Sequence, residues 1–172
     1  YFLLENVKMK KESMDVITDA LGVEPIAINS RLFSAQNRPR IYWTNIPFDT
    51  PTEDKGIVLR DILEPDVEEK YYAGKKLRES YMGGNQLNPK YKSQCNTIYP
   101  TDGKFATLCA GTHGYSFGYV PAPTYRKLTP TECERLQTVP HGYTDKGISD
   151  TQRYKMLGNG WTVDVVSHIM KG

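Results

Sequence analysis

The chain has 172 residues, of which 38% are hydrophobic and 24% charged, and its formal net charge is +2. This composition is typical of an ordinary globular protein, and a chain of this length buries about 70% of its unfolded surface. No apolar run approaches the length of a membrane span, and the weak positive charge permits a polyanionic partner without requiring one.

The first predicted element is a strand at residues 2–7 (FLLENV). Three apolar residues run into a carboxylate, an amide and a valine, a pattern typical of a strand buried on both faces, as central strands of parallel sheets are. Its glutamate, Glu5, is either solvated in the next loop or held beside a site for its proton chemistry. Taken alone it favours the solvated position, because carboxylates are mostly exposed.

A helix and two further strands should follow. Residues 8–21 place apolar side chains on one helical face, and Gly22 is a natural stop. Residues 23–28 form a short β-like run whose Pro25 suits an edge strand, and residues 40–46 form a β-branched and aromatic run. Strands separated by a helix predict an α/β sheet.

Residues 47–123 are rich in Pro, Gly, Asn, Tyr and Lys, with short strand-like pieces at 97–99 and 105–109. They predict a small, irregular, mostly β insert with long loops, which are either functional or disordered. The glycine-rich loop from Gly111 to Gly118 fits a phosphodiester approached by backbone amides. An ordinary hairpin loop explains it equally well.

Residues 124–172 turn helical. The sequences TPTE at 129–132 and SDTQ at 149–152 are capping boxes, and the second helix should end at Gly158. A third short helix should follow Thr162. We expect three of its apolar side chains to face inward: Val163, Val166 and Met170.

The three cysteines indicate free thiols. Cys95, Cys109 and Cys133 are odd in number, have no CxxC spacing and have no histidine at ligand spacing. A structural zinc site is therefore not expected. The simplest interpretation is reduced thiols in a cytoplasmic protein.

Arg38 and Arg40 are candidate functional cations. They lie two residues apart where a loop enters a strand, so both can project to one side. Two guanidinium groups on one side suit carbonyl or phosphate oxygens, although on spacing alone a pair of surface charges is more common. The sequence GNGWTV at 158–163 fits a helix stop followed by a packed tryptophan.

Taken in order, these segments resemble the C-terminal half of the DNA cytosine-5 methyltransferases. The resemblance rests on ENV, QNRPRIYW, a TL pair at 107–108, the segment at 126–143 and YKMLGNGWTV. Residues 126–143 match the family's R-x-L-T-x-x-E-x-x-R-L-Q-x-x-P pattern almost position for position, and the resemblance covers essentially the whole chain. The tryptophan of GNGWTV is most similar to phage-type bacterial enzymes and animal de novo methyltransferases.

The resemblance implies an α/β fold: a partial Rossmann-like, S-adenosylmethionine-dependent methyltransferase sheet with a small, mostly β target-recognition insert. Residues 1–46 would belong to the catalytic domain, and residues 47–123 would form the target-recognition domain. Residues 124–172 would be C-terminal helices that return to the catalytic domain.

The resemblance also implies catalytic roles. In that family a cysteine thiolate adds to C6 of a cytosine flipped out of the duplex, and C5 then takes the methyl group from S-adenosylmethionine. Glu5 would bond the N3 and amine edge of the base, with Asn6 beside it in the same motif. Arg40 would bind the O2 side, and Arg38 would support the phosphates and the nucleophile loop. Beside these motifs, proton chemistry becomes the preferred role for Glu5.

Further residues are implied to bind cofactor and DNA. Asn159 and Trp161 lie in the segment that closes on S-adenosylmethionine. Thr107 would hold the phosphate beside the flipped nucleotide, and Gln94 lies where some relatives fill the vacated space in the duplex. The candidate DNA-binding residues are Gln94, Thr107, Gly111, His113 and Arg126.

The family's Pro-Cys-Gln nucleophile stretch and its F-x-G-x-G cofactor loop are not in this sequence. The chain also starts at Tyr1 inside a predicted core strand, which suggests a piece of something longer. We therefore expect the chain alone to be inactive. Its expected partners are double-stranded DNA and a missing N-terminal catalytic half or complementing chain, with no metal and no membrane.

The expected setting is a bacterial or phage-encoded cytoplasmic enzyme of DNA methylation, as in restriction-modification. Two alternatives stay open. One is an RNA cytosine-5 methyltransferase of the same family, and the other is a DNA-binding module without catalysis of its own.

Overall fold

The computed structural model describes residues 1–74, 93–110, 117–122 and 124–172. Within them a three-stranded sheet contains β1 (Leu3–Asn6), β2 (Ile26–Asn29) and β3 (Pro39–Thr44), in the order β1-β3-β2. Both outer strands run antiparallel to β3. The run of β-branched and aromatic residues makes β3 the central strand, because it offers apolar side chains to both faces.

The prediction that residues 2–7 form a central strand of a parallel sheet, buried on both faces, is wrong for this structure. Among the described residues, strand β1 pairs only with β3, in antiparallel orientation, and Leu4 is 38% exposed. The apolar run indicated a strand but did not say on which side its neighbours lie. The edge position expected for the strand containing Ile26 is confirmed.

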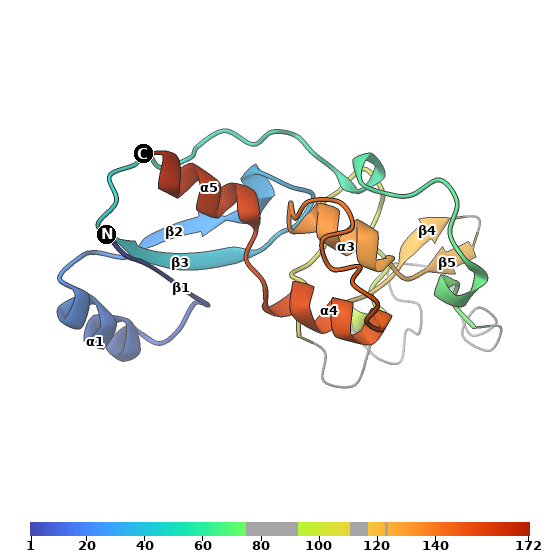
Figure 1. Cartoon of the computed structure of the whole chain (residues 1–172), viewed down its shortest axis with the longest axis horizontal. Coiled ribbons are helices and arrows are strands. Elements are labelled where there is room, and N and C mark those ends of the chain that lie inside the picture. Colours follow the sequence, from blue (N-terminus) through green and yellow to red (C-terminus); the bar gives the residue numbers. More distant parts are fainter. Residues whose placement is uncertain (75–92, 111–116, 123) are drawn as a thin grey trace.

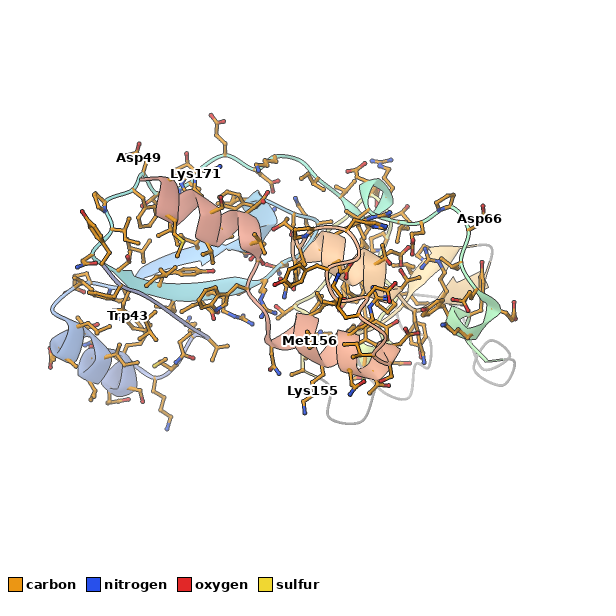
Figure 2. The ribbon with its side chains drawn as sticks, viewed as in Figure 1. Trp43, Asp49, Asp66, Lys155, Met156 and Lys171 are labelled. Carbon is orange, nitrogen blue, oxygen red and sulfur yellow. The ribbon has the colours of Figure 1, made fainter. Side chains whose placement is uncertain are left out.

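Two helices cover opposite sides of the sheet (Figure 1). Helix α1 (Lys11–Leu21) ends at Gly22, whose φ of 66° favours glycine and whose N–H donates to the Thr18 carbonyl at 2.8 Å. On this side, the Trp43 indole N–H donates to the Thr18 hydroxyl at 3.0 Å (Figure 2). No residue of α1 is fully buried.

Helix α5 (Val163–Lys171) packs on the other face of the sheet. Its Val165 and Ile169 are buried against Ile28 and Tyr42. The inward face predicted for this helix is therefore wrong, because Val163 and Met170 are 40% and 59% exposed. The pattern of apolar residues permitted either face, and contact with the sheet selects the one containing Val165 and Ile169.

A second core contains residues of helices α3 (Pro130–Leu136) and α4 (Asp150–Asn159), which lie beyond the sheet in Figure 1. Both predicted capping boxes are confirmed at the starts of these helices. Strands β4 (Val120–Ala122) and β5 (Thr124–Arg126) pair antiparallel. Buried side chains of this core come from widely separated segments, among them Leu59, Phe105, Leu108, Phe117, Leu128, Leu136 and Leu157.

The pieces predicted to be strand-like at 97–99 and 105–109 are extended segments rather than regular strands. Each makes isolated bridges only, between Ile98 and Tyr119 and between Gln36 and Phe105. Four single turns of 3-10 helix complete the described elements: Ser30–Leu32, Leu59–Asp61, Glu69–Tyr71 and Gln94–Asn96. No helix in the described part of the chain is long and apolar enough to cross a membrane.

Candidate functional site

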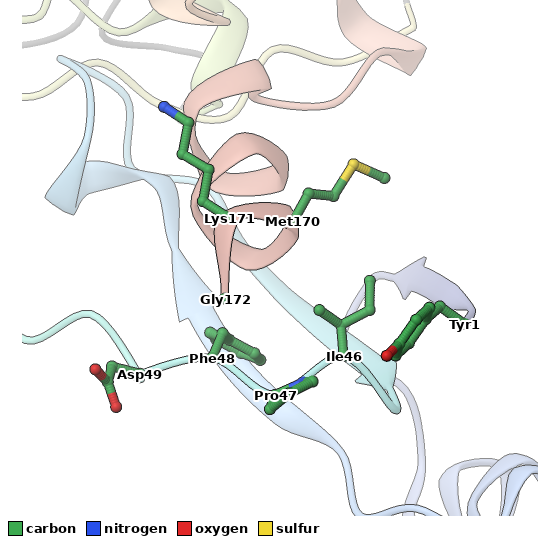
Figure 3. Close-up of a pocket in the computed structure, with 8 residues that line it drawn as sticks. All are labelled: Tyr1, Ile46, Pro47, Phe48, Asp49, Met170, Lys171 and Gly172. Carbon is green, nitrogen blue, oxygen red and sulfur yellow. The ribbon is translucent and has the colours of Figure 1, made fainter.

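One cavity, of about 740 Å³, lies beside the two ends of the chain and is mainly apolar. Figure 3 shows the apolar side chains that reach it from the end of β3 and from α5, among them Ile46, Phe48 and Met170. None of the predicted site residues that the structure describes lines this cavity. The size of a cavity alone does not make it a catalytic site.

A smaller cavity, of about 390 Å³, gathers charged and polar side chains. Four segments that are far apart in the sequence meet there: the end of β1, the start of β3, residues 107–110 and the end of α4. Its lining consists of Glu5, Asn6, Val7, Arg38, Arg40, Thr107, Leu108, Cys109, Ala110, Gly158 and Asn159.

Strand register brings the acid and one arginine together. Glu5 lies opposite Tyr42 in the β1–β3 pair, and Arg40 is the diagonal neighbour two residues earlier on the same face. The Arg40 Nε lies 2.8 Å from Glu5 Oε1 and forms an ion pair with it, and the two side chains keep 12% and 14% of their surface exposed. Arg40 Nη1 also donates to the Pro39 carbonyl.

The loop that leads into β3 is fixed by an asparagine. The Asn29 side-chain oxygen accepts from the backbone N–H groups of Arg31 and Arg38, at 3.1 and 2.9 Å. Such side-chain bonds to the backbone hold a tight turn in one conformation. Arg38 and Arg40 therefore enter the cavity from a defined backbone.

Burial and the neighbouring Arg40 charge lower the pKa of Arg38 to about 10, although Glu5 partly offsets them. The Arg38 guanidinium still carries its charge at neutral pH, since that value lies well above 7. Burial, followed by the Glu5 carboxylate, raises the pKa of the adjacent Tyr42 hydroxyl. The cavity therefore presents two guanidinium groups and one carboxyl group on its wall.

Residues 105–108 lie alongside 35–37. The Thr107 hydroxyl donates to the Asn37 carbonyl at 2.8 Å, and the Asn37 N–H donates to Phe105 O. The Gln94 side-chain amide donates to the Thr107 carbonyl at 2.7 Å, so Gln94 lies behind this segment rather than in the cavity lining.

The cavity brings together six of the predicted site residues. Strand β1 supplies an acid and an amide, the loop into β3 and β3 itself supply two arginines, and the other two are a threonine and an amide from α4. The six are Glu5, Asn6, Arg38, Arg40, Thr107 and Asn159. Trp161 instead lines a separate apolar cavity of about 250 Å³, beside Tyr143 and Met156.

Arg126 lies in the core, not at the surface. Its side chain is 2% exposed and makes two hydrogen bonds to the Glu132 carboxylate, at 2.8 and 2.7 Å. A DNA contact from Arg126 would require it to leave this ion pair. The predicted residues Gly111 and His113 lie outside the described residues.

Sequence reasoning did not single out Cys109 and Ala110, which line the cavity between Thr107 and the end of α4. The sequence signal that could have found them is the TL pair at 107–108, because Cys109 and Ala110 directly follow this pair on the same extended segment. Among the described residues, no group of three His, Cys, Asp or Glu side chains could hold a metal ion.

Residues 45–172 match the model of the C-5 cytosine-specific DNA methylase family. The chain is 28% identical over 195 residues to the type II methyltransferase M1.ScrFI of Lactococcus lactis subsp. cremoris, covering 98% of this chain and 50% of that protein. It is 30% identical to the type II methyltransferase M.SsoII of Shigella sonnei, covering 98% and 51%. The chain thus spans about half the length of these curated relatives.

An orphan methyltransferase of Bacillus phage rho11s, M.Rho11sI, is 32% identical over 117 residues, 66% of this chain and 19% of that protein. Among solved structures, the Entamoeba histolytica methyltransferase EhMeth aligns with a TM-score of 0.73 at 18% identity, covering 98% of this chain and 60% of its own. The S. pombe Dnmt2 methyltransferase aligns with a TM-score of 0.70, also at 18% identity, covering 98% and 62%. These structural likenesses establish the α/β methyltransferase fold.

Proposed function

The chain belongs to the C-5 cytosine-specific DNA methylase family, and from that premise we propose that it supplies the base-binding and target-recognition part of a DNA cytosine-5 methyltransferase. The observation that carries the proposal is the Glu5–Arg40 pair, at 2.8 Å, on the wall of a cavity. A volume of about 390 Å³ lies within the usual range of ligand pockets, about 300–1,000 Å³.

The pair retains hydrogen-bonding capacity for a base. Among the described residues Glu5 contacts Arg40 through Oε1 alone, so its other carboxylate oxygen is open to a ligand. Arg40 uses Nε and Nη1 within the protein, which leaves Nη2 open. An acid beside a guanidinium suits one edge of cytosine, where N3, the exocyclic amine and O2 lie side by side.

These groups would act on the transition state. As a nucleophile adds at C6, negative charge develops on the ring and N3 becomes more basic. Glu5 would hold a proton at N3 and accept from the amine, and Arg40 would donate to O2. Both bonds strengthen as charge develops, so they lower the barrier more than they tighten duplex binding. Cytosine reaches such a cavity only after it leaves the base stack.

S-adenosylmethionine would supply the methyl group, and two residues of this chain fit part of it. Asn159 lines the cavity that contains Glu5, with an amide suited to the amino-acid end of the cofactor. Trp161 is 46% exposed and presents an aromatic face suited to a purine ring. We propose that these two residues hold the cofactor beside the base.

We further propose that residues 47–123 recognise the DNA sequence and that the rest of the catalytic domain, with the nucleophile, is supplied outside this chain. The exposed positions on β1 and α1 support the second point. Leu4, Val7 and Val16 are 38%, 52% and 69% exposed there, and exposed apolar surface of this kind marks contact with a further segment.

The test uses a completed enzyme, in which this chain replaces the matching part of the Lactococcus lactis relative and the remaining half of that protein is kept. Incubation with radiolabelled S-adenosylmethionine should methylate duplex DNA at C5 of cytosine, while the chain alone should transfer nothing. Label on DNA from the chain alone would overturn the proposed division. Label on transfer RNA and none on DNA would favour the RNA enzyme.

The recognition role has its own test. Residues 47–123 are grafted into a relative of known specificity, and the methylated sites are mapped. An active chimera that still methylates the recipient's original sequence would contradict the role. DNA binding by the completed enzyme should also weaken steeply as salt rises, because phosphate contacts release counterions.

A further inference from the structure

Arg38 joins two segments that have no strand pairing with each other. Its side chain is 3% exposed. Its Nη1 donates to the Leu108 carbonyl at 2.7 Å, and its Nη2 donates to the carbonyls of Gly158 and Gly160 at 3.1 and 2.8 Å. One planar cation thereby bonds one backbone carbonyl of residues 107–110 and two carbonyls at the end of α4. The terminal nitrogens are occupied by protein, not aimed at solvent.

Two buried glutamines, Gln36 and Gln137, connect the same two segments. The Leu108 N–H donates to Gln36 Oε1 at 2.9 Å, and Gln36 Nε2 donates to Gln137 Oε1 at 3.2 Å. Gln137 Nε2 in turn donates to the Leu157 carbonyl at 2.6 Å, and Thr162 donates its hydroxyl hydrogen to Gln137 Oε1 at 2.9 Å. Gln36 and Gln137 are fully buried, so each of these bonds lies in a medium of low dielectric.

The two segments also touch through their backbones. A Cβ at Gly158 would collide with the carbonyl group of Cys109 and would lie 2.6 Å from the Ala110 nitrogen. Only glycine permits this approach. Charge, amide bonds and close packing therefore act at one junction.

We propose that Arg38, Gln36 and Gln137 are positioning residues that clamp residues 107–110 to residues 158–162, so that the segment facing the target nucleotide and the loop facing the cofactor move as one unit. The proposal rests on the proposed function for what the two segments bind. The clamp itself is a property of this chain. The clamp gives the two arginines different roles. Arg38 holds the walls of the cavity together, and Arg40 faces the base.

The clamp predicts mechanical coupling that the chain alone can reveal. Arg38→Lys keeps the positive charge but loses the planar fork that reaches both segments. Gln137→Met keeps the side-chain length and removes the amide. In either variant, amide hydrogen exchange should accelerate at least about tenfold in both segments together. The Leu108 N–H reports on the first segment, and the Val163 N–H, directly after residue 162, reports on the second.

Arg153→Lys is the matched control. Arg153 is also buried and contacts Glu134 and Thr144, but it touches neither clamped segment. It should lower global stability without selectively loosening 107–110 and 158–162. Faster exchange in only one of the two segments, in both clamp variants, would overturn the clamp. Equally faster exchange of both segments in Arg153→Lys would also overturn it.

In the completed enzyme, S-adenosylhomocysteine should increase the affinity for DNA. Arg38→Lys should reduce this increase at least about fivefold, and Arg153→Lys should preserve it. Undiminished tightening in Arg38→Lys would overturn the coupling. If the completed enzyme bound no DNA, the proposed function would fail while the exchange experiment still decided the clamp.

Discussion

Two arginine–glutamate pairs in this molecule have the same chemical groups and different surroundings. Arg126 and Glu132 are 2% and 0% exposed, and their two hydrogen bonds are joined by bonds from the N–H groups of Thr129 and Glu64 to the same carboxylate. Arg40 and Glu5 are 12% and 14% exposed, form an ion pair through one close nitrogen–oxygen contact and face a cavity.

The difference shows how to separate a structural pair from a functional one. Glu132 uses both carboxylate oxygens within the protein and caps α3 through Thr129, so it has little capacity left for a ligand. Glu5 has an open oxygen and a cavity beside it. A buried saturated pair determines where the backbone goes, whereas a partly open pair is available for chemistry.

The largest expected effect lies at the closed pair. Glu132→Gln leaves the Arg126 charge buried without its counter-ion, which should cost about 3 to 5 kcal/mol of the free energy of unfolding. Urea denaturation measures it. Asp15→Asn, which breaks the exposed Lys11–Asp15 pair, is the control and should change stability far less, because solvent screens exposed pairs. Equal effects would remove the distinction between closed and exposed pairs.

At the open pair, Arg40→Ala should lower the single-turnover methylation rate of the completed enzyme about 10²–10³-fold, because it removes a donor that acts as charge develops. Stability and DNA affinity should change little. Arg31→Ala, at a more exposed pair with Asp54, is the control and should keep the rate. A loss confined to DNA affinity would make Arg40 a phosphate contact instead.

Gly158→Ala separates geometry from charge, because it leaves both pairs intact. The new methyl group would displace the Cys109–Ala110 backbone, and overpacking of this kind costs about 1–3 kcal/mol. The methylation rate should fall as the cavity wall moves. Gly74→Ala is the control and should have no such effect, because a Cβ there meets nothing within 4 Å. An unchanged methylation rate in Gly158→Ala would show that the cavity wall tolerates movement.

The smallest effect concerns pH. Burial alone would raise the pKa of Glu134, but hydrogen bonds from Thr144, Gly142 and Arg153 outweigh it and hold that pKa below its ordinary value of 4.5. The resulting stabilisation is present above pH 4.5 and is lost as the pH falls through the lower, folded pKa. Glu134→Gln should therefore flatten the acid limb of the stability curve. An unchanged acid limb would contradict this source of pH dependence.

Local signals in the sequence predicted the helices. The capping boxes at Thr129 and Ser149 and the stop at Gly22 are confirmed, because caps involve side chains within a few residues of the backbone groups they satisfy. The inward face of α5 and the place of β1 were missed, since both depend on which distant segment packs against them.

The order of the motifs predicted a common site, and Glu5, Arg40, Thr107 and Asn159 do line one cavity. Their catalytic and binding roles stay predictions. The position of Arg126 could not be read from its motif, because its burial depends on the pairing of β5 and the cap of α3. The amide contact between Gln36 and Gln137 joins residues 101 positions apart, and no spacing in the sequence announces it.

The central claim is that the open pair performs chemistry while the closed pair maintains the fold. The most direct test measures the single-turnover methylation rate of Glu5→Gln in the completed enzyme, on variant protein whose free energy of unfolding is close to that of the parent. The account predicts a rate lower by about 10²–10³-fold at nearly unchanged DNA affinity, since the lost group acts as charge develops on the base. A near-normal rate would contradict it.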